Sequence, residues 1–364
     1  MLAWLGFGVG VAAFLATLGS VVETTVVPRG TRSRISRVVA RAVQAVFQFI
    51  ADRSGRWERR DRVWSLSGPT FLMALLVAWL SLLVGELTLV MAPFVDGSLA
   101  NAFRSAGAAM FTIGGANPGE PVPTVFVFVG AASGLVVVAL QIAYLPTLYA
   151  AYNRREVPVT ILDWLAGAPA WGPEILARFA LVDGLDDLDD LYQQWTTWSA
   201  DISESHTAYR SLIYFRSPTP TRSWVIAQLA MLDAAALHLA LWPSIAPFSA
   251  RRALRVGFLS LQQVAGAVRL PPTPAPADVE SDLTDADILA AFDHVVSAGL
   301  AVERTTDAER AQAVADFRGW RVNYEPAAYA LAEHIDAVPA LWSGPRRRRG
   351  ERLAPMRPER PGLD

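Results

Sequence analysis

A polar insert between two long apolar segments limits the folds open to this chain. Residues 96–121 are too short and too polar to cross a bilayer, whereas residues 69–92 and 122–152 on either side are long and apolar enough to do so. Within the insert, residues 98–110 have the pattern of a short helix, and a glycine-containing strand, residues 111–115, follows it. Non-helical backbone survives at membrane depth only where protein buries it or where it lines a water-filled path. The sequence therefore predicts a re-entrant loop between two membrane spans.

The stretch from about Pro69 to Arg155 resembles the two-helix-plus-pore-loop unit of the potassium-channel superfamily. That family carries a Thr-Val-Gly-Tyr-Gly strand in its loop, and the chain matches its first three positions with Thr-Ile-Gly. Gly and Ala stand where the family has its Tyr and second Gly. The resemblance implies an ion-selectivity filter, lined by backbone carbonyls, at Thr112, Ile113, Gly114, Gly115 and Ala116.

The same resemblance implies a homotetramer, because one loop cannot encircle an ion. It implies an integral membrane cation channel whose permeant ion is potassium, with no other cofactor. Since Gly115 and Ala116 depart from the family pattern, a weakly selective cation channel remains an alternative. A second alternative is a non-conducting, membrane-anchored scaffold or regulatory protein with a degenerate pore loop. We recognise no catalytic constellation and predict neither an enzyme nor a nucleic-acid partner.

Arginine placement predicts the topology. Residues 2–22 form a first apolar run, which we interpret as a retained N-terminal anchor (1–27) because it lacks a charged n-region and a clear cleavage site. Residues 28–62 then carry ten arginines, and arginine-rich short loops stay cytoplasmic. The chain is thus expected to be a multi-pass protein of the plasma membrane, with its N-terminus outside and its C-terminal domain in the cytoplasm.

The basic linker (28–68) contains apolar residues at helical spacing, from Val38 to Ile50, with Arg34, Arg37 and Arg41 near one end. An amphipathic helix of this kind can lie on the inner leaflet and contact anionic lipid. A linker that packs on the cytoplasmic domain explains the same charges equally well.

Ionisable and polar residues inside the pore module (69–155) predict its internal contacts. Glu86 lies within the second span and Arg104 within the short helix, and we expect them to pair and hold that helix, because an intramembrane charge normally has a partner. The alternative is that Glu86 reaches the outer interface. On the third span, four residues are candidates for the inner pore and its gate: Ser133, Gln141, Tyr144 and Pro146.

The remainder of the chain is predicted to be an all-α cytoplasmic domain (156–340), with a Pro-rich linker near 270–280 and a basic, disordered tail (341–364). Residues 161–340 hold 23 acidic residues against 12 arginines, so this part is acidic. The predicted helices are 173–182, 186–206, 222–240, 249–268, 284–299, 306–319 and 326–336. The fold class is thus an all-α membrane protein with three transmembrane helices, a re-entrant pore loop and a helical cytoplasmic domain.

Several features of that domain carry weaker hypotheses. With no cysteine and four scattered histidines, the sequence supports no metal site beyond the permeant ion. The aspartates between 183 and 190 are best explained by helix capping, because calcium sites need converging oxygens. Residues 224–242 are apolar enough for a fourth span, but Asp233 and His238 favour a buried helix of the soluble domain.

Overall fold

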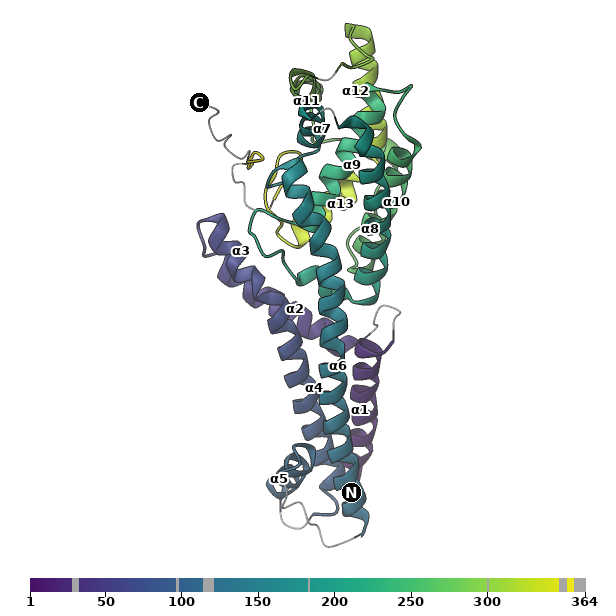
Figure 1. The fold of residues 1–364 in the computed structure, drawn as a ribbon. Coiled ribbons are helices and arrows are strands. Elements are labelled where there is room, and N and C mark those ends of the chain that lie inside the picture. The colour runs from purple at the N-terminus through teal and green to yellow at the C-terminus, as the bar shows by residue number, and fades with distance from the viewer. Residues whose placement is uncertain are drawn as a thin grey trace, which may run out of the picture. The chain divides into compact units, whose positions relative to one another are not determined.

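A computed structural model describes residues 1–27, 33–95, 98–113, 121–182, 184–299, 301–346 and 352–356. Within these ranges the chain is helical and contains no named strand, only two isolated bridges, Ala168 with Met356 and Ala340 with Leu353. The chain divides into two compact units, Met1–Ala150 and Ala151–Asp364, which we describe separately (Figure 1). The prediction of an all-α chain is confirmed for the residues described.

The first unit contains five complete helices and the beginning of a sixth. They are α1 (Leu2–Thr25), α2 (Arg34–Ala51), α3 (Trp57–Ser65), α4 (Ser67–Met91), α5 (Leu99–Met110) and the part of α6 (Pro121–Ala166) up to Ala150. Helix α6 continues as one helix through Pro146 and Pro158, so it is longer than the span predicted for 122–152.

Helices α1 and α4 run antiparallel in close contact. A Cβ atom at Gly10 would come within 2.8 Å of the Glu86 carbonyl oxygen, so only glycine permits this approach. Further along the pair, the indole nitrogen of Trp79 donates a hydrogen bond of 3.1 Å to the Ser20 hydroxyl, and Ser20 also contacts the Ser33 hydroxyl at 2.6 Å. These polar groups are buried and satisfied inside an otherwise apolar bundle.

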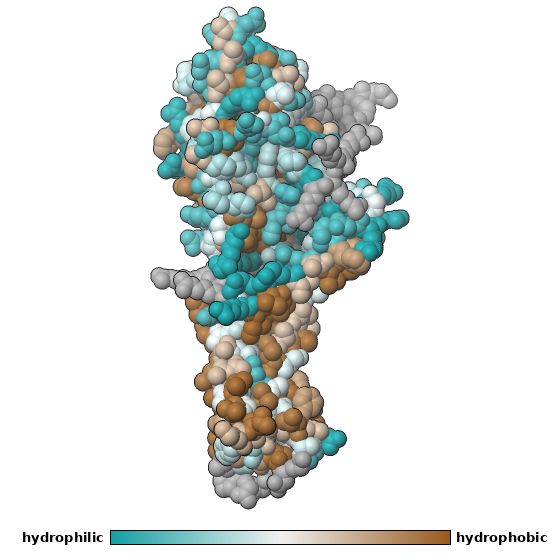
Figure 2. Space-filling view, turned by 180° about the vertical axis from the view of Figure 1, so that it is seen from behind, coloured by the Kyte–Doolittle hydropathy of each residue, from teal (hydrophilic) through white to brown (hydrophobic). Residues whose placement is uncertain are grey.

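Most of the apolar surface of these helices is not covered by protein. The share of buried residues in the most apolar stretch is 28% for α1, 33% for the helical run that contains α4 and 22% for α6. Figure 2 shows hydrophobic residues over most of the visible surface of this bundle. Exposed apolar side chains at this density are stable in hydrocarbon and costly in water. The three helices therefore have the length, composition and surface of membrane spans.

The second unit begins within α6 and adds seven further α-helices among the described residues. They are α7 (Gly172–Leu181), α8 (Leu188–Ala208), α9 (Trp224–Leu241), α10 (Phe248–Ala267), α11 (Asp285–Ser297), α12 (Asp307–Arg321) and α13 (Glu325–His334). Short 3-10 turns lie at Leu185–Asp187, Arg210–Tyr214 and Pro276–Asp278. Each α-helix falls within a few residues of a predicted range.

Helix α9 is the core of this unit. It is long and apolar enough to cross a membrane, yet all of its residues are buried, and α7, α10, α12 and α13 pack against it. Its one acidic residue, Asp233, forms an ion pair with Arg321 of α12 and accepts a hydrogen bond of 2.8 Å from the Tyr324 hydroxyl. The complete burial and the paired carboxylate favour the interpretation of α9 as a core helix of the folded unit.

A buried arginine joins the beginning of the second unit to its loops. The Arg155 guanidinium donates to the carbonyl oxygens of Leu212 (2.9 Å) and Phe215 (2.6 Å) and to the Glu156 carboxylate (2.7 Å). Arg154 and Arg155 both follow shortly after the predicted span 122–152. In the structure only Arg154 is exposed, paired with Asp201, whereas Arg155 is fully buried in protein.

The described residues of the tail predicted to be disordered make defined hydrogen bonds. Arg346 donates hydrogen bonds to the carbonyl oxygens of Ala337 and Ser343, and the Leu353 amide donates to Pro339. Residues 341–346 and 352–356 therefore contact the second unit, because their backbone and arginine donors find acceptors there. The other tail residues lie outside the described part of the chain.

Candidate functional site

Helix α5 is the short helix predicted between the two spans, and it packs against α4 through small residues. Its buried face consists of Ala102, Ala106, Ala109 and Met110, while Leu99, Phe103 and Arg104 are exposed. Helix α6 lies close to α5 and α4 at two of its glycines. A Cβ atom at Gly134 would come within 2.3 Å of the Met110 carbonyl oxygen in α5, and one at Gly130 within 2.5 Å of the Leu87 side chain in α4. Close helix packing thus accounts for both glycines.

The C-terminal end of α5 is closed by a Schellman cap. The Ile113 amide donates to the carbonyl oxygen of Ala108 (3.0 Å), and the Thr112 amide donates to that of Ala109 (3.1 Å). Thr112 takes the left-handed conformation with φ 55° that this cap requires. A β-branched residue there costs about 1–3 kcal/mol, so the surrounding contacts hold the backbone in an unfavourable state.

The structure describes two of the five predicted filter residues. Thr112 and Ile113 lie directly after α5, with 77% of the Ile113 surface exposed in the single chain. Gly114, Gly115 and Ala116 lie outside the described residues. Thr112 belongs to a helix cap rather than to an extended strand, because the α5 carbonyls satisfy its amide and that of Ile113.

The expected pairing of Glu86 with Arg104 is not formed in the single chain. Glu86 instead accepts a hydrogen bond of 2.8 Å from the Thr17 hydroxyl of α1, and the ion pairs among described residues do not include one between Glu86 and Arg104. Arg104 is on the exposed face of α5. The hydroxyl partner was missed because the contact between α1 and α4 has no signal in the sequence.

The stripe assigned to the inner pore is covered by protein within one chain. Ser133 is 8%, Gln141 6% and Tyr144 7% exposed, whereas Pro146 is exposed. The exposed residues of this part of α6 are mainly apolar, among them Phe128, Leu135, Val136 and Ile142. The three polar residues were assigned to the inner pore on their helical spacing and polarity, but in the single chain they are covered by protein.

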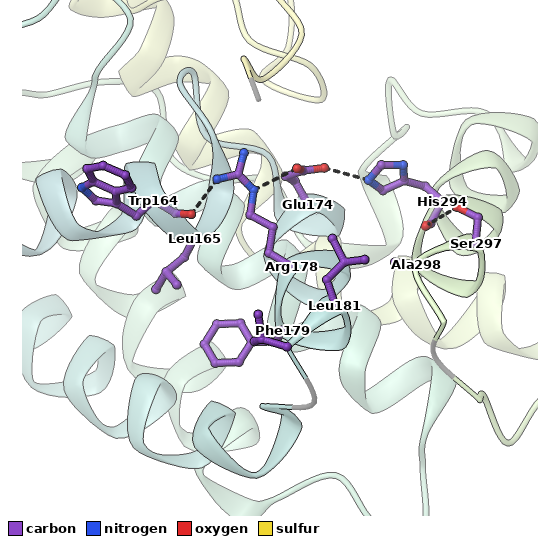
Figure 3. A pocket seen from close by; sticks show the side chains of 10 residues that line it. Trp164, Leu165, Glu174, Arg178, Phe179, Leu181, His294, Ser297 and Ala298 are labelled. Atoms are coloured by element: carbon purple, nitrogen blue, oxygen red, sulfur yellow. Dashed lines mark hydrogen bonds and ion pairs between the residues drawn. The ribbon is translucent and has the colours of Figure 1, made fainter. Parts of the chain in front are cut away.

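A cavity of about 650 Å³, which no sequence pattern indicated, opens in the second unit (Figure 3). Its apolar lining comes from the end of α6, from α7 with the residue after it, and from the end of α11: Trp164, Leu165, Phe179, Leu181, Val182 and Ala298. The polar lining residues are Ser297 and an interacting group of three, Glu174, Arg178 and His294. The volume lies within the range of small-molecule pockets.

The polar group is fixed by reciprocal contacts. Glu174 is only 1% exposed and accepts from Arg178 Nε at 2.9 Å, while its other oxygen lies 2.8 Å from His294 Nε2. Arg178 also donates to the Trp164 carbonyl oxygen at 2.5 Å. Residues 174 and 178 share one face of α7, but His294 is distant in sequence. No spacing rule could have joined the three.

The other histidines and the aspartate run have structural explanations. His206 is buried beside Arg155, with 3.3 Å between its Nε2 and the guanidinium Nη1. Burial, followed by the charge of Arg155, holds the pKa of His206 well below its usual value. In the aspartate run, hydrogen bonds from Ser249 and Gln193 lower the pKa of Asp189. Within the described ranges, no group of three or more acidic, histidine or cysteine side chains is placed to hold a metal.

The structure thus presents two candidate regions, the capped end of α5 between two apolar helices and the polar-walled cavity of the second unit. Comparison with known proteins finds no matching family model, no matching curated protein and no matching solved structure.

Proposed function

We propose that the chain is an integral membrane cation channel that conducts potassium as a homotetramer. The observation that carries this proposal is α5: a twelve-residue helix, too short to span, that lies between two long helices with uncovered apolar surface. The proposed filter begins at its C-terminal end with Thr112 and Ile113 and continues through Gly114, Gly115 and Ala116. Four such loops would supply the ring of carbonyl oxygens that replaces the hydration shell of an ion.

Helix electrostatics support a cation at this position. The aligned peptide dipoles of a helix place about half a negative charge at its C-terminal end. The end of α5 is where the proposed filter begins, so a cation there is stabilised without an acidic side chain in the membrane. The large exposure of Ile113 in the single chain also fits a place where further copies pack.

Lipid contacts and orientation follow from the basic segment. We propose that the N-terminus lies outside the plasma membrane and the second unit in the cytoplasm, with α2 on the inner leaflet. Helix α2 exposes Val38 (58%), Val46 (56%) and Phe49 (60%) beside Arg34 and Arg41. This combination of uncovered apolar residues and arginines favours anionic lipid over a folded domain as its partner.

Ion flux through liposomes tests the channel. The purified chain should give potassium flux that barium blocks, and Gly114→Ala should abolish that flux because a methyl group disturbs the proposed filter. Gly19→Ala is the matched control, since a Cβ at Gly19 meets nothing within 4 Å. A monomer that passes no ion in any salt would contradict the proposal and favour the non-conducting scaffold. Reversal potentials in mixed sodium and potassium separate a potassium channel from a weakly selective one.

A further inference from the structure

The cavity of the second unit contains an arginine that is fixed in place and only partly used. A guanidinium has five N–H donors. Arg178 directs Nε to Glu174, one Nη1 hydrogen to the Trp164 carbonyl oxygen and one Nη2 hydrogen to the Met356 carbonyl oxygen at 3.4 Å. Among the described residues this leaves one donor on each terminal nitrogen.

These two remaining donors match a carboxylate. A planar guanidinium binds the two oxygens of a carboxylate through parallel hydrogen bonds, one from each of two nitrogens. Because Glu174 and Trp164 already fix the side chain, little conformational entropy is lost when a ligand binds. The site is therefore organised before the ligand arrives.

The surroundings of Arg178 limit the ligand further. Glu174 offsets much of the charge of Arg178, and Arg178 is the one arginine among the described lining residues, so a second carboxylate on the ligand would be buried without a cationic partner. The other walls are mainly apolar and include Phe179, Leu181 and Val182; Figure 3 labels the first two of these side chains. A hydrocarbon or aromatic body is buried favourably against such walls.

We infer that this cavity binds a small organic monocarboxylate with an apolar body, whose carboxylate pairs with Arg178. The site lies within the second unit and contains no residue of the proposed filter or inner pore. Loss of ion flux and loss of ligand binding are therefore separate results.

Binding is measured on the full chain in nanodiscs with 4-phenylbutyrate as the probe. The chain carries 5-fluorotryptophan, and the ¹⁹F resonance of Trp164, which lines the cavity, is assigned by its loss in Trp164→Phe. We expect a saturable shift of this resonance at concentrations up to about 10 mM, with no comparable shift from 4-phenylbutanol or 4-phenylbutylamine. Equal shifts from the alcohol or the amine, or none from the carboxylate, would overturn the inference.

Variants locate the binding group. Arg178→Gln should weaken binding at least about tenfold, because it removes a charge-assisted pair, and Arg178→Lys should weaken it less. Arg154→Gln is the matched control, since Arg154 also pairs with a carboxylate but does not line the cavity. Ala298→Phe fills the cavity and leaves the ion pair intact, so it should abolish binding in a folded chain. Unchanged binding in either Arg178→Gln or Ala298→Phe contradicts the assignment.

Discussion

At the scale of single residues, His206 shows how burial turns an ordinary side chain into a pH-sensitive part of the fold. Its imidazole lies among Arg155, Ile202 and Trp224, and the Arg155 charge adds to the cost of protonating it. The neutral form is therefore the one that the folded protein accepts. Acid must either leave this histidine neutral or unfold the helices that bury it.

We predict that acidification destabilises the second unit through His206. The pKa of the unfolded histidine is about 6.5 and that of the folded one lies well below, so the unfolded state binds more protons between these values. The stabilising contribution is complete above pH 6.5 and decreases as the pH falls, by up to about 1.4 kcal/mol per pH unit. Thermal unfolding between pH 7 and pH 5 should show a smaller loss in His206→Gln. Equal slopes for the two proteins would contradict the prediction.

Contacts between individual side chains were the features least predictable from the sequence. Thr17 and Glu86, or Glu174 and His294, are distant in the sequence, and nothing in their local patterns marks them as neighbours. The left-handed Thr112 was also unexpected, because Gly is the usual residue at that cap position. Such features depend on packing between elements rather than on periodicity.

At the scale of elements, the sequence was far more informative. Apolar run length identified α1, α4 and α6, the helical pattern of residues 98–110 identified α5, and Pro and Gly positions separated the helices of the second unit. The sequence did not show which faces of these helices are covered by other parts of the protein. Helical spacing and polarity suggested an inner-pore face at Ser133, Gln141 and Tyr144, but these residues are buried in the single chain. The length of α6 was underestimated because the predicted span stops at residue 152, where the apolar run ends, whereas the helix continues to Ala166.

We predict that the exposed apolar face of α2 enters the bilayer interface. Since the chain has no cysteine, a single spin label can be placed at Val46→Cys in the full protein. In vesicles that contain anionic lipid, this label should be more accessible to oxygen than to a water-soluble nickel chelate, because Val46 is apolar and uncovered. Arg56→Cys, at an exposed arginine between α2 and α3, is the control and should show the reverse.

The role of the arginines is tested in the same system. Arg34→Gln together with Arg41→Gln should reduce the preference for anionic vesicles, since each arginine near a charged surface contributes about 1 kcal/mol. If the label at Val46 is as accessible to nickel as the control label, α2 faces water and the linker interpretation is favoured.

At the scale of the whole molecule, α9 and the other long apolar helices differ in their surroundings. Helices α1, α4 and α6 leave most of their apolar residues uncovered, whereas every residue of α9 is covered by protein. Composition alone cannot distinguish these cases, because all four pass the same test of length and hydropathy. Only the packing of α7, α10, α12 and α13 shows that α9 belongs to a folded core.

The burial of α9 has a consequence for biosynthesis. During translation α9 leaves the ribosome before α10, α12 and α13 exist, and Arg321, the partner of Asp233, follows 88 residues later. At ordinary rates of synthesis that delay is on the order of ten seconds, during which an apolar helix is exposed to the insertion machinery of the membrane. A carboxylate at mid-helix opposes insertion by about 2.5–3.5 kcal/mol.

Asp233→Leu should therefore divert α9 into the bilayer, and glycosylation mapping of the region after α9 would detect the changed topology. We therefore predict two successive roles for Asp233: it opposes insertion of this helix during synthesis, and in the folded chain it pairs with Arg321 in the core.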